Sequence, residues 1–386
     1  MKAVPVTCGY LPLVDSAPLI IAKELRFAAE VGLDLTLAQQ PSWSALRDRL
    51  AFGALDFAHM LSPMPIAMSL GLGAAPSKID ALMVLAVNGT VIGISDALAQ
   101  AMQAGGWRNT FDAPKSTADA VLNIADKPLR IGVPFPFSMH KLLVEYWLSK
   151  DPAFAAGNVE IITIPPPQMA GAVADNRIDM FCVGEPWGSV AVQKSGAHLI
   201  LPSSAIWQSA PEKVLGARHD WIIQNRETTD RMIRATYLAA QWLEQPQNIP
   251  LAIEILASSD HLDLPDHAIE PALTGYIAAN ADCDPIHVPN FITFHKNAAN
   301  FPWESQAQWI AARLNMPNNQ RIFRSDIFRD AITPLGANIA KASQKPEGAM
   351  TRPTTIAGTK GPLILGPDTF FDGAIFDFGA GKMLKS

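Results

Sequence analysis

Apolar and polar positions along residues 4–187 alternate between strand-like and helix-like periods, and the alternation predicts two copies of one α/β unit. Each copy opens with a short β-rich segment that ends at a glycine, Gly9 or Gly132. The helices predicted after these segments cover residues 17–29 and 44–52 in the first copy, and 139–150 and 169–174 in the second. The later strands are predicted at 33–39 and 55–58, and at 159–164 and 178–181.

The two copies share one register. Three landmark pairs are each separated by 123 positions: Gly9 and Gly132, Asp15 and Ser138, and Asp56 and Asp179. We interpret Asp15 and Ser138 as candidate helix caps. Asp56 and Asp179 are interpreted as turn or strand-edge residues, because the repeat places them in different lobes and so excludes an acid–base pair. The alternative is that any α/β protein shows such alternation, but that does not explain three equal separations.

Strand–helix–strand units predict parallel sheets covered by helices, so two copies predict two α/β lobes. Ligands of such sheets bind beyond the carboxyl ends of the strands, where helix N-termini point. Two lobes that face each other therefore form a cleft lined by helix N-termini, and unpaired N–H groups with the helix dipole favour an anion there. We expect lobe 1 over 1–92, lobe 2 over 93–203 and a return to lobe 1 over 204–341.

The chain after Pro186 is predicted to be mainly helical. Apolar residues recur at helical spacing over 227–244, 251–257, 267–279 and 306–314. Residues 342–360 are rich in Ser, Thr, Lys, Pro and Gly and are predicted to be a loop or linker. The aromatic segment 370–377 is expected to dock on the body, so that 342–386 forms a linker with a docking tail.

Composition excludes several classes of protein. Apolar residues make up 49% of the 386 residues, which is enough for a sizeable core. The net charge of −6 lacks the basic balance of a nucleic-acid-binding protein. Three cysteines, Cys8, Cys182 and Cys283, argue against a disulfide framework, and the absence of a His/Cys cluster argues against a metal site. We expect no cofactor.

The first residues bear on localisation. Met1-Lys2-Ala3 leads directly into the first predicted strand, so the basic start, apolar stretch and cleavage site of a secretory signal are missing. No apolar run reaches the length of a bilayer span. We therefore expect a cytoplasmic protein; the alternative is a periplasmic protein whose export signal has been removed.

Several motifs resemble the nitrate- and bicarbonate-binding proteins of ABC importers. The most specific runs are Pro165-Pro166-Pro167-Gln168-Met169, Phe181-Cys182-Val183-Gly184-Glu185-Pro186-Trp187 and Pro211-Glu212-Lys213. Further matching runs lie at 9–24, 42–48, 59–65, 88–89 and 370–377, so the resemblance covers nearly the whole chain. It implies a bilobal, periplasmic-binding-protein-like fold of type II, with the ligand between two α/β lobes.

Without an export signal, the chain departs from these receptors and resembles the NasS-type cytoplasmic nitrate/nitrite sensors. In those systems a receptor-like protein holds an RNA-binding antiterminator of the ANTAR class and releases it when the anion arrives. This resemblance implies an ANTAR-type partner protein, without direct contact to nucleic acid or insertion into a membrane.

A site for nitrate needs hydrogen-bond donors, one or two positive charges, and apolar or aromatic walls. Trp43, between a strand end and a helix, is predicted to wall the anion and to donate from Nε1. His140, in the first turn of its helix, can donate from one ring nitrogen. For Lys213 the resemblance implies a cation in the cleft. The alternatives are a structural tryptophan, a solvent-facing histidine and a surface lysine.

Five further residues complete the candidate site. Asn88, Gly89 and Thr90 follow a predicted buried strand near the first crossing between lobes and could present donors to the anion. The nitrate receptors have a glutamine where Thr90 falls, so the choice between nitrate and nitrite is open. Gln168 is expected to donate or to cap its helix. Glu185 suits an anion site only if it is protonated or paired with Lys213.

Three functions compete at this stage. The leading hypothesis is a sensor that closes on nitrate or nitrite and thereby releases its partner. The alternative is a solute-binding receptor of a nitrate, nitrite or bicarbonate ABC importer. An enzyme is disfavoured, because no nucleophile–base pair, metal cluster or phosphate-binding loop appears, and Cys182 lies in an apolar strand where cysteine is usually inert.

Overall fold

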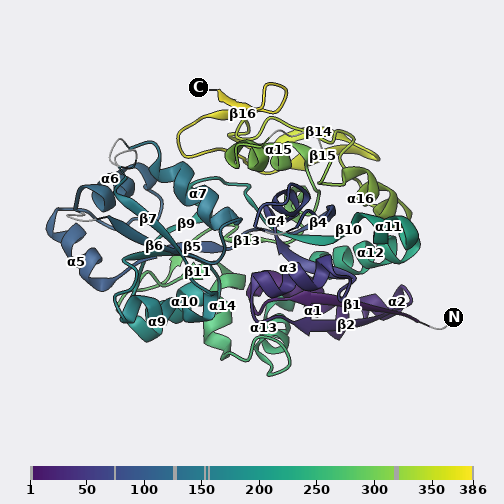
Figure 1. The fold of residues 1–386 in the computed structure, drawn as a ribbon, viewed down its shortest axis with the longest axis horizontal. Coiled ribbons are helices and arrows are strands. Elements are labelled where there is room, and N and C mark those ends of the chain that lie inside the picture. The colour runs from purple at the N-terminus through teal and green to yellow at the C-terminus, as the bar shows by residue number, and fades with distance from the viewer. Residues whose placement is uncertain are drawn as a thin grey trace.

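The computed structural model describes residues 3–73, 75–124, 128–151, 154, 157–316 and 321–384. Two sheets form separate lobes that lie side by side, with the C-terminal segment above their junction in the view of Figure 1. No helix in these described ranges is long and apolar enough to cross a membrane.

The first lobe is built on a six-stranded sheet in the order β13-β4-β10-β3-β1-β2. Its strands are β1 (Val4–Tyr10), β2 (Leu33–Gln39), β3 (Phe57–Leu61), β4 (Ile79–Asn88), β10 (Pro211–Arg218) and β13 (Ile292–Thr293). Strands β1, β2 and β3 are parallel, whereas β10 runs antiparallel to both β3 and β4. Helices α1 (Ala17–Glu24), α2 (Phe27–Glu30), α3 (Trp43–Ala51) and α4 (Met64–Ser69) connect them.

The second lobe repeats this arrangement in a five-stranded sheet of order β7-β6-β8-β5-β9. Its strands are β5 (Thr90–Ile94), β6 (Leu129–Val133), β7 (Val159–Thr163), β8 (Met180–Gly184) and β9 (His198–Pro202). Its helices are α5 (Asp96–Ala104), α6 (Pro114–Ile124), α7 (Met139–Leu148), α9 (Met169–Ala174) and α10 (Trp187–Ser195). The two α/β lobes predicted from the sequence are therefore present.

The register of the two lobes agrees with the internal repeat. Asp56 Oδ2 accepts a hydrogen bond from the backbone N–H of Thr7 at 2.8 Å, and Asp179 Oδ2 accepts one from Arg130 at 3.0 Å. The backbone N–H groups of the two aspartates donate back to the same residues. Asp56 and Asp179 thus tie equivalent strands together, as the strand-edge interpretation predicted.

The landmark pair Asp15 and Ser138 is not equivalent. Ser138 caps α7 by accepting a hydrogen bond from the Lys141 N–H at 3.2 Å, but Asp15 lies inside the short 3-10 helix η1 (Val14–Ser16) and caps nothing. The interpretation of Asp15 as a cap is therefore wrong. The predicted helix 17–29 is also broken in two, because Arg26 adopts a left-handed conformation with φ 63°.

Two crossings connect the lobes. The first is Asn88-Gly89, between β4 and β5, where both residues have positive φ values of 60° and 85°. The second lies between β9 and β10. The expected lobe boundaries at 92/93 and 203/204 fall close to these crossings. Strands β9 and β10 lie in the half of the chain predicted to be mainly helical.

Helices predicted in the second half are present within a few residues of their expected bounds. They are α12 (Arg226–Leu243), α13 (Ile249–Ala257), α14 (Asp266–Thr274) and α15 (Glu304–Arg313). Two further helices, α11 (His219–Gln224) and α16 (Ser325–Ile332), were not predicted. Helix α14 is shorter than predicted because Gly275 ends it in a left-handed conformation, and β11 (Tyr276–Ile277) pairs with β12 (Ile286–His287).

The C-terminal segment differs from the predicted loop. Strand β14 (Thr354–Gly358) pairs with β15 (Gly361–Leu365), so residues 354–358 are not a loop. Within the same stretch Lys345 is buried and bonded to two carboxylates, Glu347 and Asp368. Composition misled here, because Ser, Thr and Gly also occur in exposed hairpins. The segment ends in β16 (Ile375–Asp377) and β17 (Lys382–Leu384).

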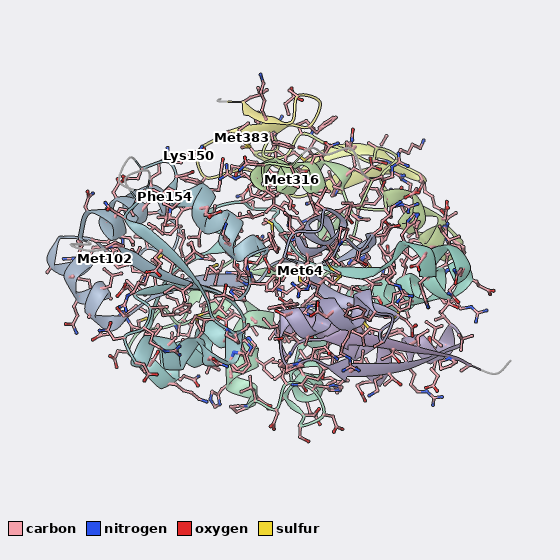
Figure 2. The ribbon with its side chains drawn as sticks, in the orientation of Figure 1. Met64, Met102, Lys150, Phe154, Met316 and Met383 are labelled. Atoms are coloured by element: carbon pink, nitrogen blue, oxygen red, sulfur yellow. The ribbon has the colours of Figure 1, made fainter. Side chains whose placement is uncertain are left out.

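The aromatic tail docks on the body as expected. Phe370 stacks on Trp207 with ring centroids 4.8 Å apart and lies 5.9 Å from the ring of Trp309. Side chains fill the interior between the ribbons in Figure 2, where the buried Met64 lies near the middle of the molecule and Met383 near its C-terminal edge. Burial of this apolar surface is what holds the lobes and the tail together.

Candidate functional site

The lobes are closed against each other along the line where their strands end. The Val14 N–H of lobe 1 donates to the Glu185 carbonyl of lobe 2 at 3.0 Å, and Trp187 Nε1 donates to the Pro12 carbonyl at 3.0 Å. A cleft of about 420 Å³ remains at this junction. It is lined from both lobes, by residues 11–13 and 39–44 and by residues 134–136, 163, 165–167 and 187.

A cluster of charged side chains is buried at the same junction. Lys213 Nζ donates to Asp15 Oδ2 at 2.5 Å and to Glu212 Oε1 at 2.8 Å. His59 Nε2 lies 2.9 Å from the other oxygen of Asp15, and His140 Nδ1 lies 3.3 Å from Glu212 Oε1. All five side chains are at most 1% exposed, so water does not screen their charges.

Burial and mutual contact shift the pKa values of this cluster in different directions. Burial alone would raise the pKa of Asp15, but Lys213 and His59 lower it to about 2. Burial raises the pKa of Glu212 to about 7, although Lys213 opposes the shift. Burial lowers the pKa of Lys213, but Asp15 and Glu212 outweigh it and raise the value above normal. At neutral pH the cluster therefore holds an ammonium, the Asp15 carboxylate and a carboxyl at its titration point.

The two histidines are neutral in this setting. Burial is the main cause that lowers the pKa of His59, and Asp15 only partly opposes it. Burial and then Lys213 hold the pKa of His140 well below its usual range. A neutral imidazole keeps one N–H donor. His59 directs Nε2 at Asp15, so His140 is the ring of the two whose donor can serve an anion.

Trp43 closes one side of the cluster. It is the first residue of α3, which Ser42 caps by accepting a hydrogen bond from Ala45 at 3.1 Å. The Lys213 ammonium lies 5.5 Å from the centroid of the Trp43 ring, and the His59 ring lies 5.8 Å from it. Trp43 Nε1 is buried and has no hydrogen-bond partner among the residues that the structure describes.

His140 faces the cluster from lobe 2. It lies in the first turn of α7, is 1% exposed, and its Nε2 likewise lacks a hydrogen-bond partner in the described ranges. A side chain at Gly184 would come within 3.8 Å of His140 Nε2, 3.5 Å of Asp15 Oδ2 and 2.8 Å of the Leu13 side chain. The missing side chain at Gly184 therefore lets the two lobes bring these groups together.

Asn88, Gly89 and Thr90 form the first crossing and are not all free to bind. Asn88 Nδ2 donates to the Gln208 carbonyl at 2.7 Å, and the Gly89 N–H donates to the Phe291 carbonyl at 2.8 Å. These groups hold the crossing in place instead of presenting donors. The Thr90 hydroxyl is buried beside the thiol of Cys182, a weak hydrogen-bonding group.

Glu185 and Gln168 are placed away from the Lys213 ammonium. Glu185 Oε2 accepts a hydrogen bond from the Ser189 N–H at 3.1 Å, in the first turn of α10, and Lys213 pairs with Asp15 and Glu212 instead; of the two alternatives, protonation and pairing with Lys213, the second is not found among the described residues. Burial raises the pKa of Glu185 to about 7. Gln168 is exposed, caps α9 without a side-chain hydrogen bond, and does not line the cleft.

Three members of the cluster were not predicted as site residues. Asp15 was interpreted as a cap, and His59 and Glu212 appeared only within matching motifs. A signal existed for Glu212, because the charged pair Glu212-Lys213 runs directly into the apolar residues Val214-Leu215, and β10 buries both charges, which therefore need partners. The contacts of Asp15 and His59 join β3, η1 and β10, and no local pattern reports such long-range proximity.

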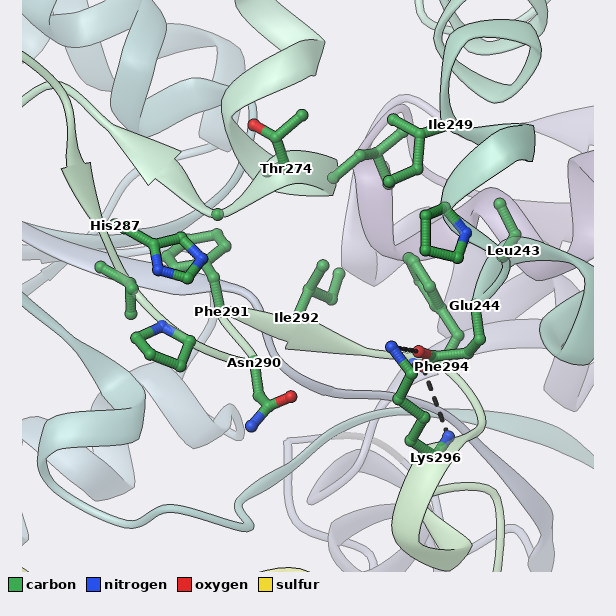
Figure 3. A pocket seen from close by; sticks show the side chains of 16 residues that line it. Leu243, Glu244, Ile249, Thr274, His287, Asn290, Phe291, Ile292, Phe294 and Lys296 are labelled. Atoms are coloured by element: carbon green, nitrogen blue, oxygen red, sulfur yellow. Dashed lines mark hydrogen bonds and ion pairs between the residues drawn. The ribbon is translucent and has the colours of Figure 1, made fainter.

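A second pocket of about 300 Å³ lies between the helices α13 and α14 and the strand β13 (Figure 3). Its two charged side chains, Glu244 and Lys296, are paired with each other. Glu244 Oε1 accepts from the N–H groups of Phe294 and His295, and Oε2 pairs with Lys296 at 3.0 Å. In the part of the chain that the structure describes, no group of three or more His, Cys, Asp or Glu is arranged to hold a metal ion.

Comparison with known proteins supplies the family context. Residues 1–257 match the model of the NMT1-like family. The chain is 30% identical over 393 aligned positions to the nitrate/nitrite binding protein NrtA of Synechococcus elongatus, covering 96% of this chain and 83% of that protein. It is also 31% identical to the nitrate import ATP-binding protein NrtC of Synechocystis, where the alignment covers 87% of this chain but spans only about half of that relative, 51%.

The fold comparison agrees. The crystal structure of the periplasmic nitrate-binding protein NrtA from Synechocystis PCC 6803 superposes with a TM-score of 0.83, at 26% identity, and covers 98% of this chain and 97% of that chain. A ligand-binding component of an ABC-type import system from Staphylococcus aureus, at 18% identity and a TM-score of 0.64, shares the fold. The bilobal, periplasmic-binding-protein-like fold predicted from the sequence is thereby confirmed.

Proposed function

The chain belongs to the NMT1-like family, and from this premise we propose that it is a solute-binding protein whose lobes close on a small oxyanion, nitrate or nitrite. Relatives named as nitrate and nitrite binding proteins support this choice of ligand. The proposal places the anion at the junction of the lobes, beside Lys213, with Trp43 and His140 as donors.

One observation carries the proposal. Trp43 Nε1 from lobe 1 and His140 Nε2 from lobe 2 are both buried without a hydrogen-bond partner in the described residues, and both side chains belong to the cluster around Lys213. A buried donor without a partner costs about 1–3 kcal/mol, so proteins rarely leave one unless a ligand or water satisfies it. A flat oxyanion accepts hydrogen bonds at several oxygens and meets this requirement.

We place the protein as the receptor of an importer in preference to a sensor, because the relatives are binding and ATP-binding proteins of nitrate and bicarbonate transport. Release of an ANTAR-type antiterminator stays a prediction from resemblance. The two roles differ in location, since a receptor works outside the inner membrane and a sensor in the cytoplasm. Fractionation of the source cells, with co-purification of any RNA-binding partner, distinguishes them.

Titration calorimetry on dialysed protein tests the ligand. Nitrate and nitrite are each expected to give saturable heat at one site, and chloride at the same ionic strength is expected to give none. Bicarbonate is the third arm, because relatives in this family include bicarbonate transport proteins. Absence of heat with nitrate and with nitrite would overturn the assignment.

A further inference from the structure

The charges around Lys213 do not favour an anion as they stand. Lys213 already donates to two carboxyl groups, Asp15 at 2.5 Å and Glu212 at 2.8 Å. With both carboxylates ionised and His59 and His140 neutral, the cluster carries one net negative charge inside a closed, buried junction. A further anion would be repelled there, because buried charges interact strongly.

Charge balance therefore requires a proton to enter with the anion. Asp15 is not the acceptor, since it has the shortest contact with the ammonium and Lys213 and His59 together hold its pKa at about 2 despite burial. Glu212 is the better acceptor, because burial raises its pKa to about 7. Its Oε1 also lies 3.3 Å from His140 Nδ1, which has no hydrogen-bond partner among the described residues, so a proton on Glu212 has an acceptor on the facing lobe.

Three other titratable side chains near Glu212, those of Cys182, His59 and Glu185, do not take up this proton. Cys182 of β8 interacts electrostatically with Glu212. Burial raises the pKa of its thiol far above neutrality, so the thiol is already protonated. His59 of β3 contacts Asp15 and not Glu212. Burial also raises the pKa of Glu185 to about 7, but Glu185 is bound to the first turn of α10 and forms no ion pair with Lys213 or His140 among the described residues, so it stands outside the charge balance of the cluster. Protonation of Glu212 also weakens its hold on the Lys213 ammonium, which leaves one N–H donor of Lys213 for the anion.

We propose that the protein takes up a proton together with its anion, held by Glu212 and His140 between the lobes, an inference that rests on the proposed function. Nitrate is the conjugate base of a strong acid and does not itself titrate near neutrality, so any pH dependence belongs to the protein. At pH values above the pKa of the Glu212–His140 pair, the apparent affinity for nitrate falls about tenfold per pH unit, because each nitrate must bind together with one proton. The solute delivered or sensed is then an anion with a proton, not a bare anion.

Calorimetry with nitrate in two buffers of different ionisation enthalpy measures this directly. At pH 8 the wild-type protein is expected to take up about one proton per nitrate, and at pH 5.5 close to none. Glu212→Gln mimics the protonated carboxyl, so its affinity at pH 8 is expected to match that of the wild type near pH 6, without proton uptake. Glu347→Gln removes a similarly buried carboxyl from the C-terminal tail and is expected to keep the wild-type uptake.

The outcomes separate the two proposals. Heat that is the same in both buffers at pH 8 would overturn proton-coupled binding and leave the oxyanion assignment standing. Wild-type uptake in Glu212→Gln would overturn the role of Glu212. No heat with nitrate or nitrite at any pH would remove the proposed function itself. Because the two-buffer measurement is made on the wild-type protein, it tests proton uptake even if Glu212→Gln fails to fold.

Discussion

Replacing Lys213 with methionine removes the cation of the buried cluster while nearly preserving the length of the side chain. Nζ of Lys213 is fully buried and bonded to Asp15 and Glu212. Breaking a buried ion pair by removing one partner costs about 3–5 kcal/mol, because the remaining charge stays buried without compensation. We expect Lys213→Met to lower the free energy of unfolding at pH 7 by roughly this amount and to abolish nitrate binding.

The pH dependence of this loss has a definite sign. Without Lys213 the pKa of Asp15 must rise from about 2, so the folded variant binds a proton that the unfolded chain releases. The deficit relative to the wild type is therefore expected to shrink as the pH falls from 7 to 5. Each unit of pKa shift corresponds to about 1.4 kcal/mol, which sets the scale of the recovery.

Lys345→Met is the matched control. Lys345 is the other buried lysine among the described residues and also bridges two carboxylates, Glu347 and Asp368, but in the C-terminal tail. It is expected to lose similar stability and to keep nitrate binding. Urea unfolding followed by tryptophan fluorescence gives the stability, and calorimetry gives the binding. A loss below about 1 kcal/mol for Lys213→Met, or loss of binding in Lys345→Met, would refute the reasoning.

Three further substitutions test separate parts of the site. Trp43→Phe removes a donor without a protein partner, so nitrate affinity should fall about 10- to 150-fold while urea unfolding changes little; unchanged affinity would contradict the role of Nε1. Gly184→Ala places a methyl group 2.8 Å from Leu13 across the junction, which should hinder closure and weaken binding by about 1–3 kcal/mol in calorimetry, whereas wild-type affinity would show that the lobes tolerate it. Burial raises the pKa of Glu212 to about 7, so the stability that its protonated form contributes is present below about pH 4.5 and is lost as the pH rises to 7. The free energy of unfolding of Glu212→Gln, measured by urea titration, should therefore rise by up to about 3 kcal/mol relative to the wild type between these pH values. A difference in unfolding free energy that does not change with pH would contradict the pKa shift.

Local patterns in the sequence were enough to predict much of the fold. Strand β2 and helix α9 have the predicted bounds, and the 123-residue separation reappears as the matching contacts of Asp56 and Asp179. Periodicity reports these elements because each has an apolar face. It did not report β14, in which only Gly358 is buried and whose composition is that of a loop.

The candidate site was predictable only in part. Trp43 and His140 were predicted from their positions at the starts of helices, and Lys213 from the resemblance; the structure brings the three together, but each was considered as an independent donor or cation. The sequence does not reveal that Asp15, 198 positions from Lys213, accepts a hydrogen bond from the Lys213 ammonium. Nor does it show that Gln168 remains exposed while Glu185 caps α10, because both outcomes depend on how the lobes close.

A crystal structure of the protein grown with nitrate tests the central claim most directly. The account predicts electron density for one nitrate at the junction of the lobes, within hydrogen-bond distance of Lys213 Nζ and in contact with Trp43 Nε1 or His140 Nε2. Nitrate found instead in the pocket of Figure 3, or a junction that stays empty under conditions where calorimetry shows saturation, would contradict it.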